Sequence, residues 1–361
     1  MKGLDLCRGF FFETMKPIMD QYFPGLTYSA GLIGYGSDVL GYDDAVSRDH
    51  MWGPRFYLFL REEDIELGEA VLTALSEHLP CTYQGFSVNF TAPDPDDGGV
   101  QHPEFVDRGP VRPLIFIRTV DGFLEERLGT SRLSDLRPAD WLAFSEHRLL
   151  SLNAGELFVD GLGMRERLAP LRYYPREVRL YLIASSWDII ASEQAFPRRC
   201  GDCGDGIGAR ILCARICERL MRLCFLYRET YAPYSKWFGT AFSRLDVGGA
   251  LKEALRTALS AEAPEEREKH LVRAQALTAE LHNESGVTPP VDFRVEGYFG
   301  RDIRVIRAER FAEAASEALR GTALEGVPLI GSMSQAGGLS NFSDDPARIP
   351  RIRALYRGEE G

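Results

Sequence analysis

A group of small and acidic residues near the N-terminus has the composition of a phosphate-binding site. Gly34, Gly36 and Ser37 follow an apolar segment, and Asp49 precedes a second apolar segment, FYLFL. Glycine and serine let backbone amides approach phosphate oxygens closely, and a carboxylate can hold the cation that shields those oxygens. Residues 28–61 therefore predict phosphate and metal chemistry.

The turn at Gly36-Ser37 is the predicted phosphate-binding element. Its amides and the Ser37 hydroxyl can donate to the β- and γ-phosphates of a nucleotide, and Asp49 can hold Mg²⁺. The dinucleotide-binding and P-loop fingerprints do not fit, because Val39 stands where the next glycine is required and no lysine follows the glycines. A purely structural turn of small residues is the alternative.

Strands and helices alternate around this turn, which predicts an α+β (α/β-like) domain with a mixed sheet over residues 1–170. Residues 171–361 have helical apolar spacing apart from a short hairpin near 291–306. The predicted strands of the first domain cover 28–35, 56–60, 82–90 and 114–120, followed by a hairpin of 157–159 and 164–168. The predicted helices cover 9–23, 64–79, 123–128, 175–194, 207–231, 249–259, 265–282 and 308–319.

Composition narrows the class of protein. A net charge of -11 and a pI near 5.2 argue against a nucleic-acid coat or a basic membrane-surface protein, but they allow nucleotide binding. No stretch approaches the roughly 20 apolar residues that span a bilayer. The seven cysteines are expected to be reduced, which favours a cytoplasmic location.

The string YAPYSKW in the helical half is a second candidate site. Tyr234 can stack on a base, and Lys236 supplies a cation suited to a phosphate. The alternative is that the neighbouring aromatic side chains form core and Lys236 extends to water.

Four cysteines in the same half are a candidate zinc site, namely Cys200, Cys203, Cys213 and Cys217. Tetrahedral thiolate coordination is typical of structural zinc. The alternative is that Cys213 and Cys217, which recur at helical spacing among apolar residues, pack as small hydrophobes.

Three strings resemble a known group of proteins: GYGSDVLGYDDAVSRDHMWGPR, LRYYPREVRLYLIASSW and YAPYSKWFGTAFSRL. They are similar to a family of nucleotidyltransferase-like proteins recorded as a domain of unknown function, whose pattern includes DHxWGPR. That family resembles the superfamily of kanamycin nucleotidyltransferase and the minimal nucleotidyltransferases. The resemblance implies a nucleotidyltransferase domain followed by a helical domain.

The resemblance also implies roles for particular residues. Gly36 and Ser37 match the phosphate-binding pair, and the amides of Gly36, Ser37 and Asp38 are expected to contact a triphosphate. Asp49 matches the first of two acids separated by one residue, and position 51, where the second acid is expected, is Met51.

Because Met51 carries no carboxylate, further ligands for the metal would have to come from other residues. His50, Asp43 and Asp44 are the substitute metal ligands near Asp49, and Asp121 is the nearest candidate for a third acid.

The implied reaction is transfer of a nucleoside monophosphate from a nucleoside triphosphate to an acceptor hydroxyl on a small molecule, with Mg²⁺ as cofactor and Asp49 as catalytic residue. The nucleotide is expected between the two domains, with Lys236 and Tyr234 contributed by the helical one. The alternative function is a nucleotide-binding or regulatory module that keeps the fold without catalysis, because two-metal phosphoryl transfer needs several carboxylates.

Overall fold

The computed structural model describes residues 1–48, 51–337 and 344–356. The chain forms two compact units. The first comprises residues 1–135 and 148–172, and the second comprises residues 136–147 and 173–361. Asp49 and His50 lie outside the described residues, so their roles stay predictions.

A four-stranded mixed sheet forms the centre of the first unit. The strand order is β5-β2-β1-β6, in which β2 runs parallel to β5 and antiparallel to β1, and β1 runs antiparallel to β6. The strands are β1 (Ser29–Leu32), β2 (Arg55–Leu60), β5 (Leu114–Thr119) and β6 (Glu156–Asp160). This arrangement confirms the predicted mixed sheet.

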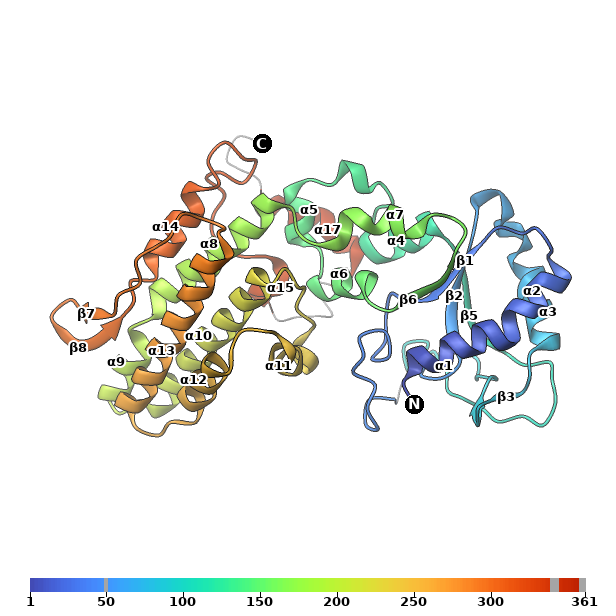
Figure 1. The fold of residues 1–361 in the computed structure, drawn as a ribbon, viewed down its shortest axis with the longest axis horizontal. Helices are drawn as coiled ribbons and strands as arrows, with labels where there is room; N and C mark the ends of the chain where they lie inside the picture. The colour runs from blue at the N-terminus through green and yellow to red at the C-terminus, as the bar shows by residue number, and fades with distance from the viewer. Residues whose placement is uncertain (49–50, 338–343, 357–361) are drawn as a thin grey trace. The chain divides into compact units, whose positions relative to one another are not determined.

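Helices cover both faces of this sheet, so β2 is buried along its whole length (Figure 1). On one face Phe56 packs against Phe10 of the N-terminal helix, with 6.0 Å between ring centroids. On the other face Tyr57 and Phe59 contact Phe123, at 5.0 and 5.2 Å. The helices of this unit are α1 (Gly3–Phe10), a π-helical turn (Phe11–Met15), α2 (Lys16–Tyr22), α3 (Gly68–His78), α4 (Val120–Leu128), α6 (Glu146–Asn153, which crosses the boundary between the units) and α7 (Met164–Leu168).

Helix α7 corrects the predicted hairpin, because Met164–Leu168 is not a strand. The Asp160 carboxylate accepts hydrogen bonds from the Met164 and Arg165 amides at 2.6 and 3.0 Å. Amides at the start of a helix lack partners within the helix, and an acidic side chain placed there satisfies them. The short apolar pattern of this segment did not distinguish helix from strand.

The predicted strand 82–90 is also wrong in part, because it folds back on itself. Strands β3 (Thr82–Tyr83) and β4 (Phe86–Ser87) pair antiparallel. Gln84 and Gly85 between them have φ of 48° and 85°. Two successive residues with positive φ are typical of a tight hairpin turn, in which glycine is favoured.

The second unit is mainly helical, as predicted (Figure 1). Helix α8 packs on α10 and α14, and α13 packs on α10 and α12. The principal helices are α5 (Pro138–Ala143), α8 (Arg176–Glu193), α9 (Phe196–Asp202), α10 (Gly206–Tyr227), α11 (Ser235–Arg244), α12 (Gly249–Ser260), α13 (Pro264–Ser285), α14 (Glu309–Glu317), α15 (Met333–Gly337) and α17 (Ile349–Ile352).

A small hairpin interrupts the helices of this unit. Its strands, β7 (Glu296–Tyr298) and β8 (Arg301–Val305), pair antiparallel. Within the described part of the chain, no helix is both long enough and apolar enough to span a membrane.

Candidate phosphate-binding site

The chain makes a tight turn directly after β1. Gly34 and Gly36 have φ of 87° and 114°, values that side-chain-bearing residues rarely adopt. The Tyr42 amide closes the turn by donating to the Ser37 carbonyl at 2.7 Å. Within the described residues, the amides of Gly36, Ser37 and Asp38 donate no hydrogen bond. Successive unpaired amides around residues of positive φ form a concave site for an anion.

A buried ion pair between Arg55 and Asp38 supports this turn. Arg55, the first residue of β2, donates from Nη2 to Asp38 Oδ1 at 2.6 Å and to the Tyr35 carbonyl at 3.0 Å. Both charged side chains are at most 2% exposed. Burial is the largest single effect and lowers the pKa of Arg55, but Asp38, Tyr35 and Cys7 together raise it more, so this pKa lies above its ordinary value and the guanidinium stays charged.

The ion pair also explains why residue 36 is glycine. A Cβ on Gly36 would collide with Arg55 Nη2 and Asp38 Oδ1. Gly36 therefore has a structural role, as the alternative interpretation of the turn expected, in addition to its predicted role in phosphate binding.

Two guanidinium groups lie close to the ring of Tyr35. Arg55 Cζ lies 4.3 Å from the centroid of the Tyr35 ring, and Arg127 Cζ lies 5.4 Å from it. Arg127, on α4, donates to the Tyr57 hydroxyl at 2.7 Å and forms an ion pair with Glu126 at 3.5 Å. Because Asp38 offsets the charge of Arg55, we take Arg127 as a cation that contributes positive field at the turn.

The acids predicted as substitute metal ligands have other partners. Asp43 Oδ2 accepts from the Gly3 amide at 2.7 Å, and its Oδ1 pairs with Lys2 Nζ at 2.9 Å. Asp44 accepts from the Val46 and Ser47 amides at 3.0 and 2.9 Å.

Asp121, the candidate third acid, forms an ion pair with Arg167. Among the described residues, no three histidine, cysteine, aspartate or glutamate side chains converge on a point that could hold a metal. The carboxylates that can be placed therefore do not fit a magnesium site.

Met51 occupies the position at which the resemblance expects a second acid. Its Sδ lies 4.0 Å from the Tyr35 hydroxyl, and its φ is 48°. The Ser37 hydroxyl donates to the Ser47 carbonyl at 2.5 Å. This bond holds the segment that leads to Asp49 beside the turn, and it makes the Ser37 hydroxyl a structural donor.

In the second unit, two of the strings that carry the resemblance pack against each other. The rings of Tyr173 and Tyr174 lie 5.1 and 4.8 Å from that of Tyr231. The Ala232 amide donates to Glu146 Oε1 at 2.9 Å. Burial raises the pKa of Glu146, an effect that nearby Arg222 opposes. Sequence reasoning missed Glu146, because nothing in its local sequence marks it as buried.

Tyr234 and Lys236 belong to the start of α11. Tyr234 contacts the His147 ring with 4.8 Å between centroids, and the exposed Lys236 places Nζ 4.8 Å from the Trp237 ring. Both residues belong to the second unit, whereas Gly36 and Ser37 belong to the first. Their predicted role in nucleotide binding stays a prediction.

The candidate zinc cysteines lie in different environments. Cys213 and Cys217 are buried on α10, and the Cys213 thiol donates to the Ala258 carbonyl at 3.6 Å. Cys203 is exposed and Cys200 is half-buried. The buried pair packs as small apolar side chains, as the alternative interpretation expected.

Comparison with known proteins gives one family match. Residues 141–238 match a family described as a domain of unknown function (DUF4037). This range contains the string LRYYPREVRLYLIASSW and the first eight residues of YAPYSKWFGTAFSRL, whereas GYGSDVLGYDDAVSRDHMWGPR lies outside it. The match confirms the predicted resemblance to a family of unknown function, over less than half of the chain.

A solved structure of a nucleotidyltransferase-like protein from Exiguobacterium sibiricum 255-15 is also similar to this chain. The identity is 12% and the TM-score is 0.31, over 76% of this chain and 77% of that chain. No curated protein matches the chain. A TM-score of 0.31 is too low to equate the two folds. Over residues 141–238, the chain is thus similar to the DUF4037 family, whose description assigns no function.

Proposed function

We propose that the first unit binds the phosphates of a nucleoside triphosphate at the turn after β1. The observation that supports this most directly is the row of amides of Gly36, Ser37 and Asp38, which have no acceptor within the described residues. Three N–H groups on one concave turn match the oxygens of a phosphate group.

The charge near the turn favours the same ligand. Arg127 has a side chain that is 16% exposed and lies on the Tyr35 ring. Tyr35 is held in turn by Arg55. The turn therefore offers neutral amides on a rigid base, and Arg127 is a nearby cation whose charge Glu126 only partly offsets.

Binding of ATP by the whole protein tests the proposal, with isothermal titration calorimetry as the measurement. We expect binding in the presence and in the absence of Mg²⁺, because the described carboxylates do not form a metal site. Arg127→Gln should weaken binding about tenfold, since it removes a charge near the phosphates.

Arg118→Gln is the matched control, because Arg118 also pairs with Glu126, at 3.2 Å, but its side chain is 42% exposed. Its affinity for ATP should equal that of the wild type. Absence of ATP binding at millimolar concentration, or equal affinities in the two variants, would refute the proposal.

Nucleotidyl transfer is the second candidate function, as the resemblance implies. The Ser37–Ser47 hydrogen bond favours it, because it holds the approach to Asp49 beside the turn. In this reaction the acceptor hydroxyl oxygen bonds to the α-phosphorus, and the bond from that phosphorus to the β-phosphate oxygen breaks. Pyrophosphate leaves and the hydroxyl proton passes to a base. Asp49 is the proposed catalytic residue and Mg²⁺ ligand.

Release of pyrophosphate separates transfer from binding alone. Extracts of small molecules with hydroxyl groups would be supplied as acceptors, together with each nucleoside triphosphate and Mg²⁺. Asp49→Asn should abolish release while leaving the melting temperature unchanged. Undiminished release in that variant would eliminate Asp49 as the catalytic residue.

A further inference from the structure

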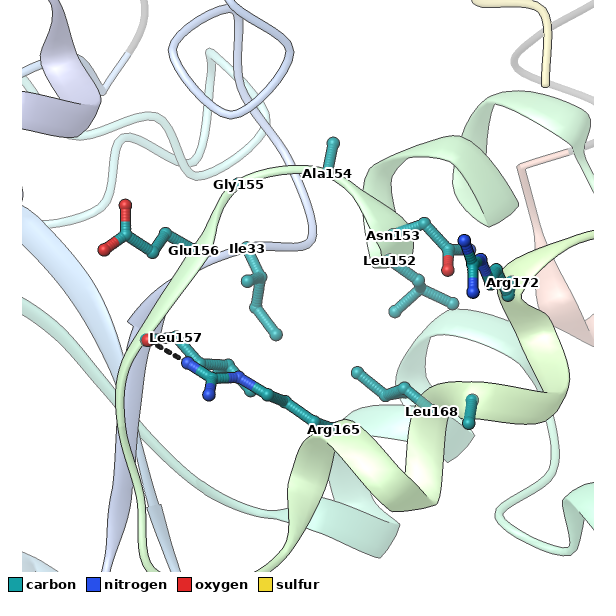
Figure 2. Close-up of a pocket in the computed structure, with 11 residues that line it drawn as sticks. Ile33, Leu152, Asn153, Ala154, Gly155, Glu156, Leu157, Arg165, Leu168 and Arg172 are labelled. Carbon is teal, nitrogen blue, oxygen red and sulfur yellow. Dashed lines mark hydrogen bonds between the residues drawn. The ribbon is translucent and has the colours of Figure 1, made fainter. Parts of the chain in front are cut away.

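A cavity in the first unit lies beside the end of β1. Its volume is about 460 Å³, within the range of small-molecule sites. Figure 2 shows side chains from three segments around it: Ile33 after β1, the residues that join α6 to β6, and α7 with the turn after it. The cavity is distinct from the turn proposed to bind phosphates, because none of Gly36, Ser37 and Asp38 lines it.

Hydrogen bonds hold the walls of this cavity in place. Asn153 Nδ2 donates to the Leu149 and Leu171 carbonyls, each at 2.8 Å, which ties the end of α6 to the turn after α7. A Cβ on Gly155 would collide with the Leu32 carbonyl, so the connection from α6 to β6 lies directly against β1. The cavity is therefore preformed.

The floor of the cavity is apolar. Ile33, Leu152 and Leu168 direct their side chains toward its centre (Figure 2), and each is at most 8% exposed. Such a surface favours the hydrocarbon or ring portion of a ligand.

The polar groups around the cavity are mainly cationic. Arg165 Nη2 donates to the Leu157 carbonyl at 2.9 Å, which leaves further N–H groups of this guanidinium for a ligand. Arg172 forms neither a hydrogen bond nor an ion pair in the part of the chain that the structure describes. Glu156, the acid of the lining, is held by Arg8 Nε at 2.9 Å, and its carboxylate points away from the floor (Figure 2).

We propose that this cavity binds a small organic anion. A phosphate or carboxylate group would bind Arg165 and Arg172, and the apolar portion of the same molecule would lie on Ile33, Leu152 and Leu168. Guanidinium groups suit both anions, because their N–H donors match two oxygens of either group. Arg172 has no carboxylate partner among the described residues, and Arg165 lies near Asp160 without a direct ion pair to it, so a bound anion can pair with both guanidinium groups. The proposal does not depend on nucleotide binding at the Gly36-Ser37 turn.

Calorimetric titration of the whole protein with three probes tests this site. The probes are phenyl phosphate, benzoate and benzyl alcohol, which share a ring but differ in the polar group. Binding of phenyl phosphate alone would assign a phosphate ligand, and binding of benzoate alone would assign a carboxylate ligand. Inorganic phosphate should bind at least tenfold more weakly than phenyl phosphate, because it does not use the apolar floor.

Variants test the location. Arg172→Gln should weaken binding of the anionic probe about tenfold, and Ala169→Phe should abolish it by filling the cavity. Arg61→Gln, at a side chain 44% exposed and outside the cavity, is the control and should bind as the wild type does. ATP affinity should be unchanged in Arg172→Gln, which distinguishes failure of this site from failure of the proposed nucleotide site.

Three results would overturn the proposal: no binding of either anionic probe at millimolar concentration, equal binding of benzyl alcohol, or equal affinity in Arg172→Gln and Arg61→Gln. A melting temperature equal to that of the wild type would show that each variant is folded.

Discussion

Asp38→Asn tests whether the buried pair with Arg55 holds the turn together. At an N–O distance of 2.6 Å and an effective dielectric constant of about 20, the attraction between the two charges is roughly 6 kcal/mol. The substitution would leave the guanidinium buried without a counter-charge, and Arg55 Nε and Nη1 already lack acceptors. We expect a loss of about 3–5 kcal/mol in the free energy of unfolding of the first unit.

The assay must follow the two units separately, because they need not unfold together. Hydrogen exchange measured by mass spectrometry in increasing urea gives a free energy for peptides of each unit. Asp38→Asn should lower it for β1 and β2 and leave that of α10 and α13 unchanged. Asp20→Asn is the control, since the pair of Asp20 with Lys16 is exposed and solvent screens its attraction.

A double variant identifies the cause of the loss. Asp38→Asn combined with Arg55→Met removes both charges, so it should be less destabilised than Asp38→Asn alone. A loss of under about 1 kcal/mol in Asp38→Asn, or a double variant less stable than the single one, would refute the reasoning.

Three other substitutions give separate tests. Burial lowers the pKa of His282 to about 4, so the unfolded chain binds a proton below about pH 6.5 while the folded one does not. The second unit should lose roughly 3 kcal/mol of stability as the pH falls from 6.5 to 4. His282→Gln should flatten that part of a series of urea unfolding midpoints measured at different pH values, with His102→Gln in the first unit as the control. Met51→Asp, which restores an acid at the expected position, should make ATP binding at least about tenfold tighter with Mg²⁺ than without it in calorimetry; no difference would contradict the assignment of that position. Gly36→Ala should destabilise the first unit by about 1–3 kcal/mol in urea unfolding, because residue 36 has a φ of 114° and lies against the ion pair of Arg55 with Asp38. A variant as stable as the wild type would show that the turn has room for a side chain.

Features with a strong local pattern were predicted correctly from sequence. The apolar run at residues 56–60 is part of β2, and the segments 175–194 and 249–259 correspond closely to α8 and α12. Segments 175–194 and 249–259 are long enough for their apolar period to indicate helix rather than strand, and the run 56–60 is apolar at every residue, as in a strand buried on both faces. Met164–Leu168 was too short for that choice, and its structure depends on capping by Asp160.

The parts of the site that sequence reasoning missed depend on contacts between distant residues. Arg55 lies 17 positions from Asp38, and Arg127 lies 70 positions from Tyr57. An arginine in sequence does not show which carboxylate or ring it will meet, so only the fold identified these partners. The predicted roles of Gly36 and Ser37 could be stated in advance because glycine and serine have a local meaning in a turn.

The path of the chain between the two units limits how the protein can be divided. The chain leaves the first unit after residue 135, returns at 148 and leaves again after 172. A fragment that ends at 172 would thus carry α5, whose buried Trp141 and Leu142 belong with α8 of the other unit. It would expose an apolar surface and tend to aggregate. Replacing residues 136–147 with a short glycine-serine linker is the rational route to an isolated first unit, and on the ribosome the first unit can close only after residue 172 has been synthesised.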